Sequence, residues 1–216
     1  MNGKMRFLGI TLALCISMIS VLSSVYFLGL GTNYINAKLQ NLGINKIVPN
    51  YTELDGNVIS YLKGKSPDLS QEFNAREVSH LQDVKNLINI LKALVALFSL
   101  GFLAGSYYVL EKTRGKKSLK FFAKVLLHAG FYTLVFSLLA FFLMNSSFDS
   151  SFESFHRIFF KEGSYLFDPQ TEMLTRTYPQ ELFQSLAIRI STGIIAISTL
   201  WVMIGYIMNS KAKNIK

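Results

Sequence analysis

Four long apolar runs decide what this chain can fold into. They cover residues 7–30, 87–110, 121–144 and 186–208, and each is close to the about 20 residues that a helix needs to cross about 30 Å of hydrocarbon. Half of the residues are hydrophobic and only 16% are charged, which is more apolar than one small soluble core requires. The sequence therefore predicts an all-α integral membrane protein with four transmembrane helices.

Lys and Arg gather on one side of the predicted membrane. The segment before the first run, the 111–120 connection and the segment after the fourth run together hold ten bases and one acid, Glu111. The other connections, 31–84 and 145–185, hold eight bases and twelve acids. Because cytoplasmic segments retain Lys and Arg, we expect both termini and the 111–120 loop in the cytoplasm and the two longer loops outside. The net charge of +9 then reflects topology, and no nucleic-acid partner is expected.

No repeat, low-complexity stretch or Pro/Gly-rich linker divides the sequence, so we expect a single membrane domain over residues 1–216. The first run is longer than the apolar core of a cleaved signal peptide, which predicts an uncleaved anchor. The single cysteine, Cys15, leaves no partner for an intrachain disulfide and no multi-cysteine metal site.

The first outer loop is predicted to contain a short β-hairpin. Residues 45–62 combine β-branched and aromatic residues with an Asp55-Gly56 turn signal, a pattern typical of two short strands joined by a turn. With the second outer loop, this hairpin is expected to form a small extracytoplasmic cap.

A helix should begin near Ala75 and continue into the second run, because Asn74 has the character of an N-cap with Glu77 three residues later. His80 then lies about 10 Å above the apolar boundary, at the level of the lipid headgroups. Glu77 and Asp83 lie three residues to either side, near enough to hydrogen-bond the imidazole or hold its charged form. The alternative is an exposed, acid-flanked helix start that only complements the helix dipole.

The second outer loop predicts an amphipathic helix in the membrane interface. Its phenylalanines recur at intervals of four, three and four residues, which on a helix form a single stripe: Phe148, Phe152, Phe155 and Phe159. His156 lies within one turn of this stripe, so it should be partly removed from water. A packed interfacial histidine without a catalytic role fits the same pattern.

The third histidine, His128, lies eight residues into the third run from its cytoplasmic end. About 24 Å of helix separates it from the outer boundary, so it cannot join the other two. We assign it to helix packing or to a polar contact in the cytoplasmic half.

The sequence lacks the motifs of several hydrolases, including the G-x-S-x-G elbow and H-E-x-x-H. Zinc is not expected either, since the usual local ligand spacing is absent. What remains is acid–base or nucleophilic work by imidazole at the membrane surface, on a substrate that stays in the lipid. Acyl transfer fits, because one imidazole can take a proton from an attacking amine or hydroxyl while a second, or an arginine, stabilises the oxyanion.

Two stretches of the outer loops resemble one family of bacterial membrane proteins. They are Glu77-x-x-His80-x-x-Asp83-Val84, and the run from Phe155 to Phe160 with Tyr165-Leu166-Phe167-Asp168-Pro169 and Tyr178-Pro179 after it. With the span count and topology, the chain resembles the Lit-type lipoprotein intramolecular transacylase family over essentially its whole length. Tyr165 stands where members of that family often have Trp.

The resemblance implies transfer of the sn-2 acyl chain of an S-diacylglyceryl cysteine to the α-amino group of the same cysteine. The product is an N-acyl S-monoacylglyceryl, or lyso-form, lipoprotein. The implied partners are diacylglyceryl-modified bacterial lipoproteins and membrane lipids, and no metal or cofactor is required. The implied location is the bacterial plasma membrane, with the active site at the extracytoplasmic surface.

For this reaction, His80 is the expected base, oriented by Glu77 or Asp83, and His156 the expected oxyanion stabiliser or proton donor. Reversed roles and a covalent acyl-imidazole both stay open. If the two rings lay more than about 10 Å apart, a mechanism with two imidazoles would be excluded.

Three further residues are expected to support the site or position the substrate, namely Arg157, Tyr165 and Asp168. Arg157 could do so by contacting a lipid phosphate or an ester oxygen. Two other functions stay open. A non-enzymatic four-helix scaffold or partner-binding subunit would tolerate substitution of both histidines, and an enzyme with separate acyl donor and acceptor would depend on an added lipid.

Overall fold

The computed structural model describes residues 3–65 and 67–214, which fold into two compact units. Unit 1 is built from residues up to 25, 92–142 and 190 onward, and unit 2 from 26–91 and 143–189. The boundaries between the units fall inside four long helices, α1 (Gly3–Gly29), α4 (Ala75–Lys112), α5 (Lys116–Ser146) and α8 (Gln180–Asn214).

These four helices are long and apolar enough to cross a membrane. Apart from residue 30, all four predicted runs lie inside them. Each helix extends beyond its apolar run where the run is flanked by polar residues, because helix propensity does not end at the membrane boundary. The chain is therefore a multi-pass membrane protein, as predicted.

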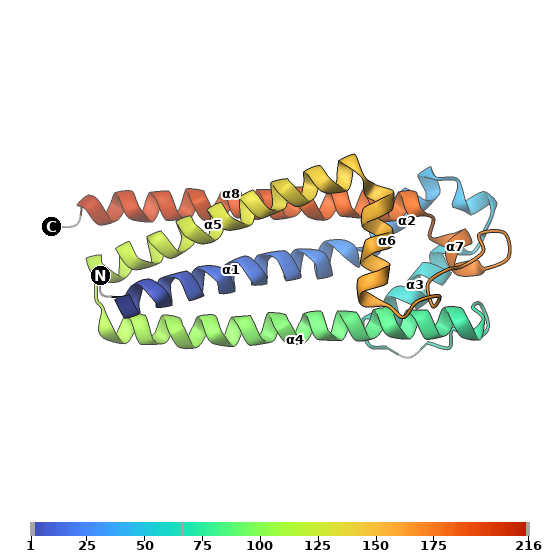
Figure 1. Cartoon of the computed structure of the whole chain (residues 1–216), viewed down its shortest axis with the longest axis horizontal. Coiled ribbons are helices and arrows are strands. Elements are labelled where there is room, and N and C mark those ends of the chain that lie inside the picture. The colour runs from blue at the N-terminus through green and yellow to red at the C-terminus, as the bar shows by residue number, and fades with distance from the viewer. Residues whose placement is uncertain (1–2, 66, 215–216) are drawn as a thin grey trace. The chain divides into compact units, whose positions relative to one another are not determined.

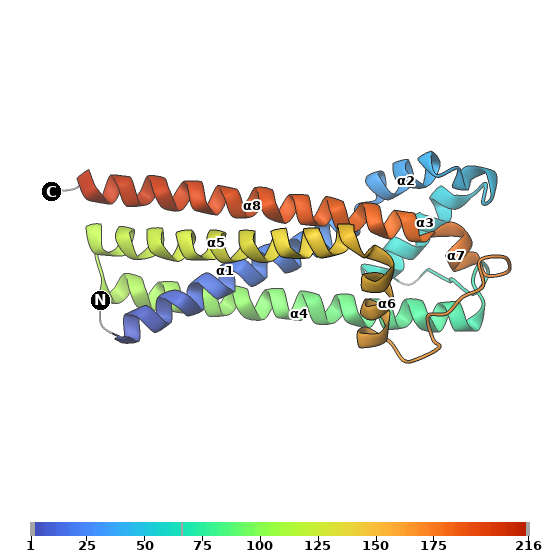
Figure 2. The same ribbon diagram turned by 45° about the horizontal axis from the view of Figure 1, so that its top comes forward.

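Within unit 1, segments of the four long helices run side by side (Figures 1 and 2). Glycines allow α5 and α8 to approach closely. A Cβ atom added at Gly130 would lie 2.7 Å from the carbonyl oxygen of Ser198, and one added at Gly205 would lie 2.9 Å from the amide nitrogen of Leu127. Small residues at such crossings are typical of helices that pack in lipid.

Hydroxyl groups in unit 1 are satisfied mostly by the carbonyls of their own helices. Ser20 donates to the carbonyl of Ile16 at 2.8 Å, and Ser198 donates to that of Ile195 at 2.8 Å. The indole N–H of Trp201 donates to Ser20 Oγ at 3.0 Å. Such pairing suits hydrocarbon, where water cannot satisfy a polar group.

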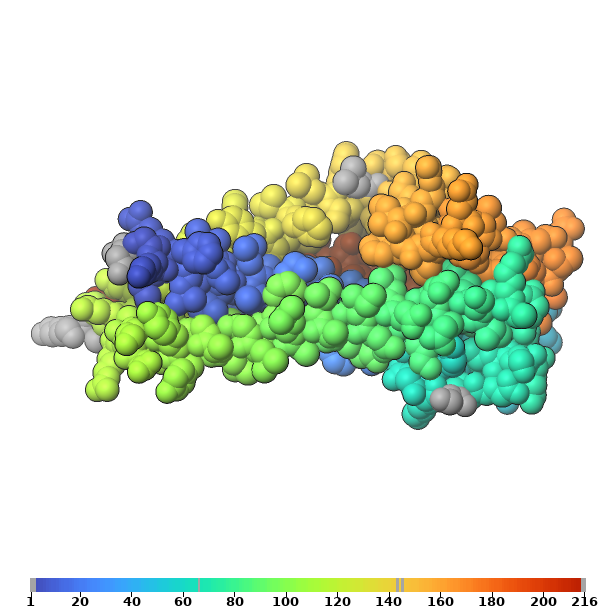
Figure 3. Space-filling view, turned by 60° about the horizontal axis from the view of Figure 1, so that its bottom comes forward, coloured from blue at the N-terminus to red at the C-terminus, as the bar shows by residue number. Residues whose placement is uncertain are grey.

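The unit 1 part of α4 presents large apolar side chains outward. Leu97, Leu100 and Leu103 are 62–66% exposed, and Figure 3 shows the side chains of α4, in green, spread along one face of the molecule. An exposed apolar helix face of this kind is what a span needs where it meets lipid.

Unit 2 has a core of the kind found in water-soluble domains. It contains the N-terminal parts of α4 and α8 and the C-terminal ends of α1 and α5. Its other elements are α2 (Thr32–Asn41), the 3₁₀ helix η1 (Ile44–Lys46), α3 (Tyr51–Leu62), α6 (Phe148–Phe159) and α7 (Met173–Thr177). The core joins α2, α3, α4, α7 and α8 through buried apolar side chains that include Leu39, Leu54, Leu81, Leu174 and Leu182.

The predicted hairpin in residues 45–62 is wrong, because most of this stretch is helix α3. Its buried residues recur every three or four positions, as one face of a helix requires: Tyr51, Leu54, Asp55, Val58, Ile59 and Leu62. Asp55 and Gly56 lie inside the helix instead of forming a turn. No strand occurs in residues 3–65 or 67–214.

The predicted start of α4 at Ala75 is confirmed, together with its cap. Asn74 Oδ1 accepts the backbone N–H of Glu77 at 3.0 Å, and Glu77 Oε2 accepts the backbone N–H of Asn74 at 2.8 Å. This reciprocal pair is a capping box. The predicted helix that carries the aromatic stripe is also present, as α6.

Candidate active site

His80 on α4 and His156 on α6 come together in unit 2. Their ring centroids lie 6.2 Å apart with 22° between the ring planes, well inside the limit of about 10 Å set by a two-imidazole mechanism. The two imidazoles are therefore close enough to act on the same substrate group.

Aromatic rings enclose the two imidazoles. Phe160 lies 4.8 Å from the His80 ring and 5.5 Å from the His156 ring, and Phe167 lies 5.5 Å from His80. Phe152 and Tyr165 lie 4.3 and 5.1 Å from His156. Sequence reasoning placed only Tyr165 among the site residues, because the rings of Phe160 and Phe167 reach His80 across a long sequence separation.

His80 is neutral in this enclosure. Its side chain is only 7% exposed, and its Nδ1 is buried with no hydrogen-bond partner. His80 precedes the apolar run of α4, and burial lowers its pKa to about 4; His156 acts in the same direction and the Asp83 carboxylate in the opposite one. A neutral imidazole with a low pKa is a poor proton acceptor but a competent N–H donor.

His156 is half-buried, and its tautomer is set by its own helix. Its Nδ1 lies 2.7 Å from the carbonyl oxygen of Phe152. Because a carbonyl only accepts, Nδ1 carries the hydrogen in that bond, which leaves Nε2 of the neutral ring as a proton acceptor.

Glu77 was expected to orient the imidazole, but it holds backbone instead. It is 2% exposed, and its two oxygens accept the N–H of Asn74 and, at 2.6 Å, the N–H of Leu174 at the start of α7. Asp83 is half-buried and acts on His80 through its charge.

A second buried acid, Glu172, was not identified from the sequence. It accepts two hydrogen bonds from Arg76 at 2.7 Å each and one from the backbone N–H of Asp168 at 2.6 Å. The Arg76 guanidinium lies 5.1 Å from the centre of the Phe167 ring, which in turn faces His80. The spacing of residues in the sequence could not predict the contact between Arg76 and Glu172, because these residues are 96 positions apart.

Of the three remaining residues expected at the site, one contacts a histidine and two are exposed. Tyr165 reaches His156, as described. Asp168 is exposed and organises a turn, in which its Oδ1 accepts the N–H of Gln170 and its Oδ2 the hydroxyl of Thr171. Arg157 is exposed on α6. Within the described parts of the chain, no cluster of three or more His, Cys, Asp or Glu side chains could hold a metal ion.

Comparison with known families decides the identity of the chain. Residues 5–183 match the model of the family described as lipoprotein intramolecular transacylase Lit. The chain belongs to this family. It is therefore a membrane-integral acyltransferase that acts on lipoproteins. The alternative of a non-enzymatic scaffold is not favoured.

Solved structures of one Lit protein share the fold. The Lit transacylase from Bacillus cereus, an integral membrane protein solved in meso, matches with a TM-score of 0.87 at 19% identity over 100% of both chains. Two of its variants, with one histidine replaced by alanine or arginine, match with TM-scores of 0.81 and 0.80, also at 19% identity. These matches cover 97–98% of this chain and 94–96% of theirs. None of the curated proteins compared with the chain matches it.

A third buried acid lies in unit 2 of this Lit-family protein. Asp55 on α3 is fully buried and accepts the hydroxyl of Tyr178 at 3.2 Å. Burial raises the pKa of Asp55 to about 6, and burial together with Asp55 raises the pKa of Tyr178 well above its ordinary value. Glu77 and Asp55 thus hold the two ends of α7, at Leu174 and Tyr178.

Proposed function

We propose that this transacylase moves the sn-2 acyl chain of a lipoprotein's S-diacylglyceryl cysteine to the α-amino nitrogen of that cysteine. The nitrogen attacks the ester carbonyl, a C–N bond forms, the C–O bond to the glycerol breaks, and the amine proton ends on the glycerol oxygen. No other reactant is needed. The observation that carries the proposal is the pair of imidazoles 6.2 Å apart within an aromatic enclosure.

The geometry favours His156 as the base, the reverse of the preference drawn from the sequence. Its Nδ1–H is bound to the carbonyl of Phe152, so its Nε2 can take the amine proton and later give it to the glycerol oxygen. His80, buried and neutral, would donate an N–H to the oxyanion that develops on the ester carbonyl. Donor and acceptor sit on one cysteine, so proximity supplies much of the acceleration.

The proposed site lies on the extracytoplasmic side of the bacterial plasma membrane, with both termini inside. The support is the distribution of charge: ten bases and one acid in the segments assigned to the cytoplasm, against eight bases and twelve acids in the two outer loops. The aromatic stripe of α6 would then lie in the outer interface, where an S-diacylglyceryl cysteine is anchored.

The test is mass spectrometry of lipoprotein N-terminal peptides from cells that otherwise make only diacylated lipoproteins. His156→Ala should lower the rate of acyl transfer by about 10²–10⁴-fold, the contribution of a general base. The control is Glu153→Ala, an exposed position one turn away on α6, which should behave like the wild type. If both histidine variants still transfer the acyl chain at normal membrane levels, the proposal fails.

Glutamine distinguishes the two roles, because its amide can donate a hydrogen bond but cannot take up a proton. His80→Ala should lose about 10²–10³-fold, as for one oxyanion donor, whereas His80→Gln should recover part of that loss. His156→Gln should be as inactive as His156→Ala. Recovery at position 156 and none at position 80 would restore His80 as the base.

A further inference from the structure

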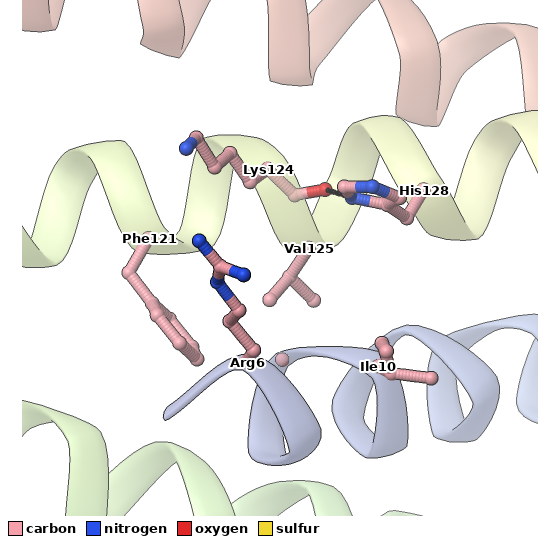
Figure 4. A pocket seen from close by; sticks show the side chains of 7 residues that line it. Arg6, Ile10, Phe121, Lys124, Val125 and His128 are labelled. Atoms are coloured by element: carbon pink, nitrogen blue, oxygen red, sulfur yellow. Dashed lines mark hydrogen bonds between the residues drawn. The ribbon is translucent and has the colours of Figure 1, made fainter. Parts of the chain in front are cut away.

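The surface of unit 1 is hollowed between α1 and α5, next to the basic segments of the chain. The hollow has a volume of about 260 Å³. It is lined by Arg6, Gly9 and Ile10 of α1 and by Phe121, Lys124, Val125 and His128 of α5 (Figure 4).

Two of the residues that line this hollow, Arg6 and Lys124, are cations without a carboxylate partner. Figure 4 shows Arg6 extending from α1 toward α5, where Lys124 lies. Neither forms an ion pair with any residue in 3–65 or 67–214. Glu111 is the sole acid in the sequence of unit 1, so the protein itself offers almost no compensating negative charge here.

The cations lie where the headgroups of the inner leaflet would be. Arg6 directly precedes the first apolar run, and Lys124 lies three residues inside the third, about 5 Å from its cytoplasmic end. Long basic side chains at this depth extend toward lipid phosphates while their stems lie against apolar surface. Gly9, Ile10, Phe121 and Val125 supply that surface.

A second hollow lies further along α5 and shares one lining residue, His128, with the first. It has a volume of about 470 Å³ and is lined by Leu127, His128, Phe131, Tyr132 and Val202. His128 borders both hollows. The exposed His128 ring is held by its Nδ1, 2.6 Å from the carbonyl oxygen of Lys124, so of its two predicted roles the polar contact is the one observed.

We propose that these two neighbouring hollows bind one anionic phospholipid, independently of the transacylase reaction. Its phosphate would lie between Arg6 and Lys124, and an acyl chain would follow α5 past His128 toward Phe131 and Val202. Two cations without a carboxylate partner at one end and a mostly apolar lining beyond them match an anionic head with an apolar tail. A neutral lipid would leave the cations unpaired, and a free phosphate would leave the second hollow unfilled.

The experiment measures lipid binding to the full-length protein, delipidated in a neutral detergent, by native mass spectrometry. Four probes are compared: phosphatidylglycerol, zwitterionic phosphatidylcholine, diacylglycerol and glycerol 3-phosphate. We expect one tightly bound phosphatidylglycerol and weaker binding of the other three. The double variant Arg6→Gln/Lys124→Gln should weaken phosphatidylglycerol binding about 30-fold, from two charge contacts at the membrane surface.

The matched control is Lys4→Gln/Lys120→Gln, which removes the same charge from exposed positions on α1 and α5 outside the hollow. It should bind phosphatidylglycerol like the wild type. A third variant, Gly9→Leu, blocks the hollow with all charges kept. A Cβ at Gly9 would meet only the Phe121 ring at 3.6 Å, so the leucine side chain can enter the hollow, and binding should fall.

Four results would overturn the proposal. They are equal loss in the double variant and its control, equal binding of phosphatidylcholine and phosphatidylglycerol, equal binding of diacylglycerol, and binding of glycerol 3-phosphate as tight as that of the lipid. Loss of binding in the double variant with acyl transfer unchanged would support the site whether or not the histidine mechanism holds.

Discussion

The two units satisfy their polar groups by different means. Unit 1 contains a single carboxylate, Glu111, and pairs buried hydroxyls such as Ser20 mostly with carbonyls of the same helix. Unit 2 contains the other twelve acids and uses buried carboxylates to join separate elements, as Glu77 joins α4 to α7. Unit 1 is thus built to be solvated by lipid, whereas unit 2 has the interior of a water-soluble domain.

Replacing a leucine with alanine should change the free energy of unfolding by very different amounts in the two units. Leu54 in the core of unit 2 is 1% exposed, whereas Leu200 in unit 1 is 54% exposed. Leu54→Ala should lower the free energy of unfolding by about 2–5 kcal/mol, and Leu200→Ala by less than about 0.5 kcal/mol, because lipid fills the vacated space. Thermal unfolding in lipid nanodiscs measures both. Equal losses would mean that unit 2 lacks a packed core of its own.

Stability should depend on pH through Asp55. Burial raises its pKa to about 6, above the value of about 3.9 in an unfolded chain. As the pH rises, the unfolded chain loses this proton first, so the folded state is disfavoured by about 2–3 kcal/mol once the pH exceeds 6. Asp55→Asn cannot ionise and should be more stable than the wild type at pH 7.5.

The advantage of Asp55→Asn should shrink as the pH falls from 6 to 4, because the wild-type carboxyl takes up its proton in the folded state over this range. Thermal midpoints at pH 7.5 and pH 4 measure the effect. Glu53→Gln, an exposed position on the same helix, should give no such pH-dependent difference. An Asp55→Asn variant that is less stable at pH 7.5 would contradict the expectation.

The stability of unit 1 should depend on the close approach of its helices more than on pH. Gly130→Ala would place a Cβ 2.7 Å from the Ser198 carbonyl oxygen, and we expect it to destabilise the fold by about 1–3 kcal/mol. Gly101 is the control, because a Cβ there would lie 3.8 Å from Cys15 Sγ. Gly101→Ala should be neutral or more stable by up to about 1 kcal/mol. Similar thermal midpoints for the two variants would argue against tight α5–α8 packing.

The smallest expected effect concerns Glu172, which holds Arg76 against Phe167 beside His80. If the Glu172–Arg76 pair keeps this ring in place, Glu172→Gln should let water reach the imidazole and raise the pKa of His80 by about one unit. NMR titration of ¹³C-labelled histidine measures this shift, with His80→Gln to assign the signal.

The sign of that shift separates positioning from a direct effect of charge. Removing a carboxylate, with Arg76 left unpaired, would by its field alone lower the pKa of His80. Glu162→Gln removes the same charge from an exposed position in the same loop and should leave His80 nearly unchanged. A lowered or unchanged pKa in Glu172→Gln would show that the ring does not depend on the ion pair.

Much of the fold could be predicted, because its signals are local. Apolar runs of the length of a membrane marked the four long helices, Asn74 and Glu77 marked the start of α4, and phenylalanine spacing marked α6. The hairpin failed where local signals conflict. Asp55-Gly56 is typical of a turn, but the three- and four-residue spacing around it fits a helix, and burial against the core decided the outcome.

The site could be predicted only in part. The approach of His80 and His156 was anticipated, and so was the contact of Glu77 with Asn74, but the second contact of Glu77 was not. Glu77 was expected to orient His80, three residues away, whereas its second hydrogen-bond partner, the N–H of Leu174, is 97 residues away. Glu172 and Asp55 were missed for the same reason, since long-range partners leave no spacing pattern in one sequence.

The aromatic enclosure around His80 also bears on which product is formed. Any enzyme that activates an ester carbonyl for attack by an amine exposes it to a competing nucleophile, water, and the two outcomes are transfer and hydrolysis. Phe160 and Phe167 cover an imidazole that is 7% exposed, and exclusion of water from an active site suppresses such side reactions. If the reaction takes place between the two histidines as proposed, the rings would favour transfer over hydrolysis and so keep the acyl chain on the lipoprotein instead of releasing it as a free fatty acid.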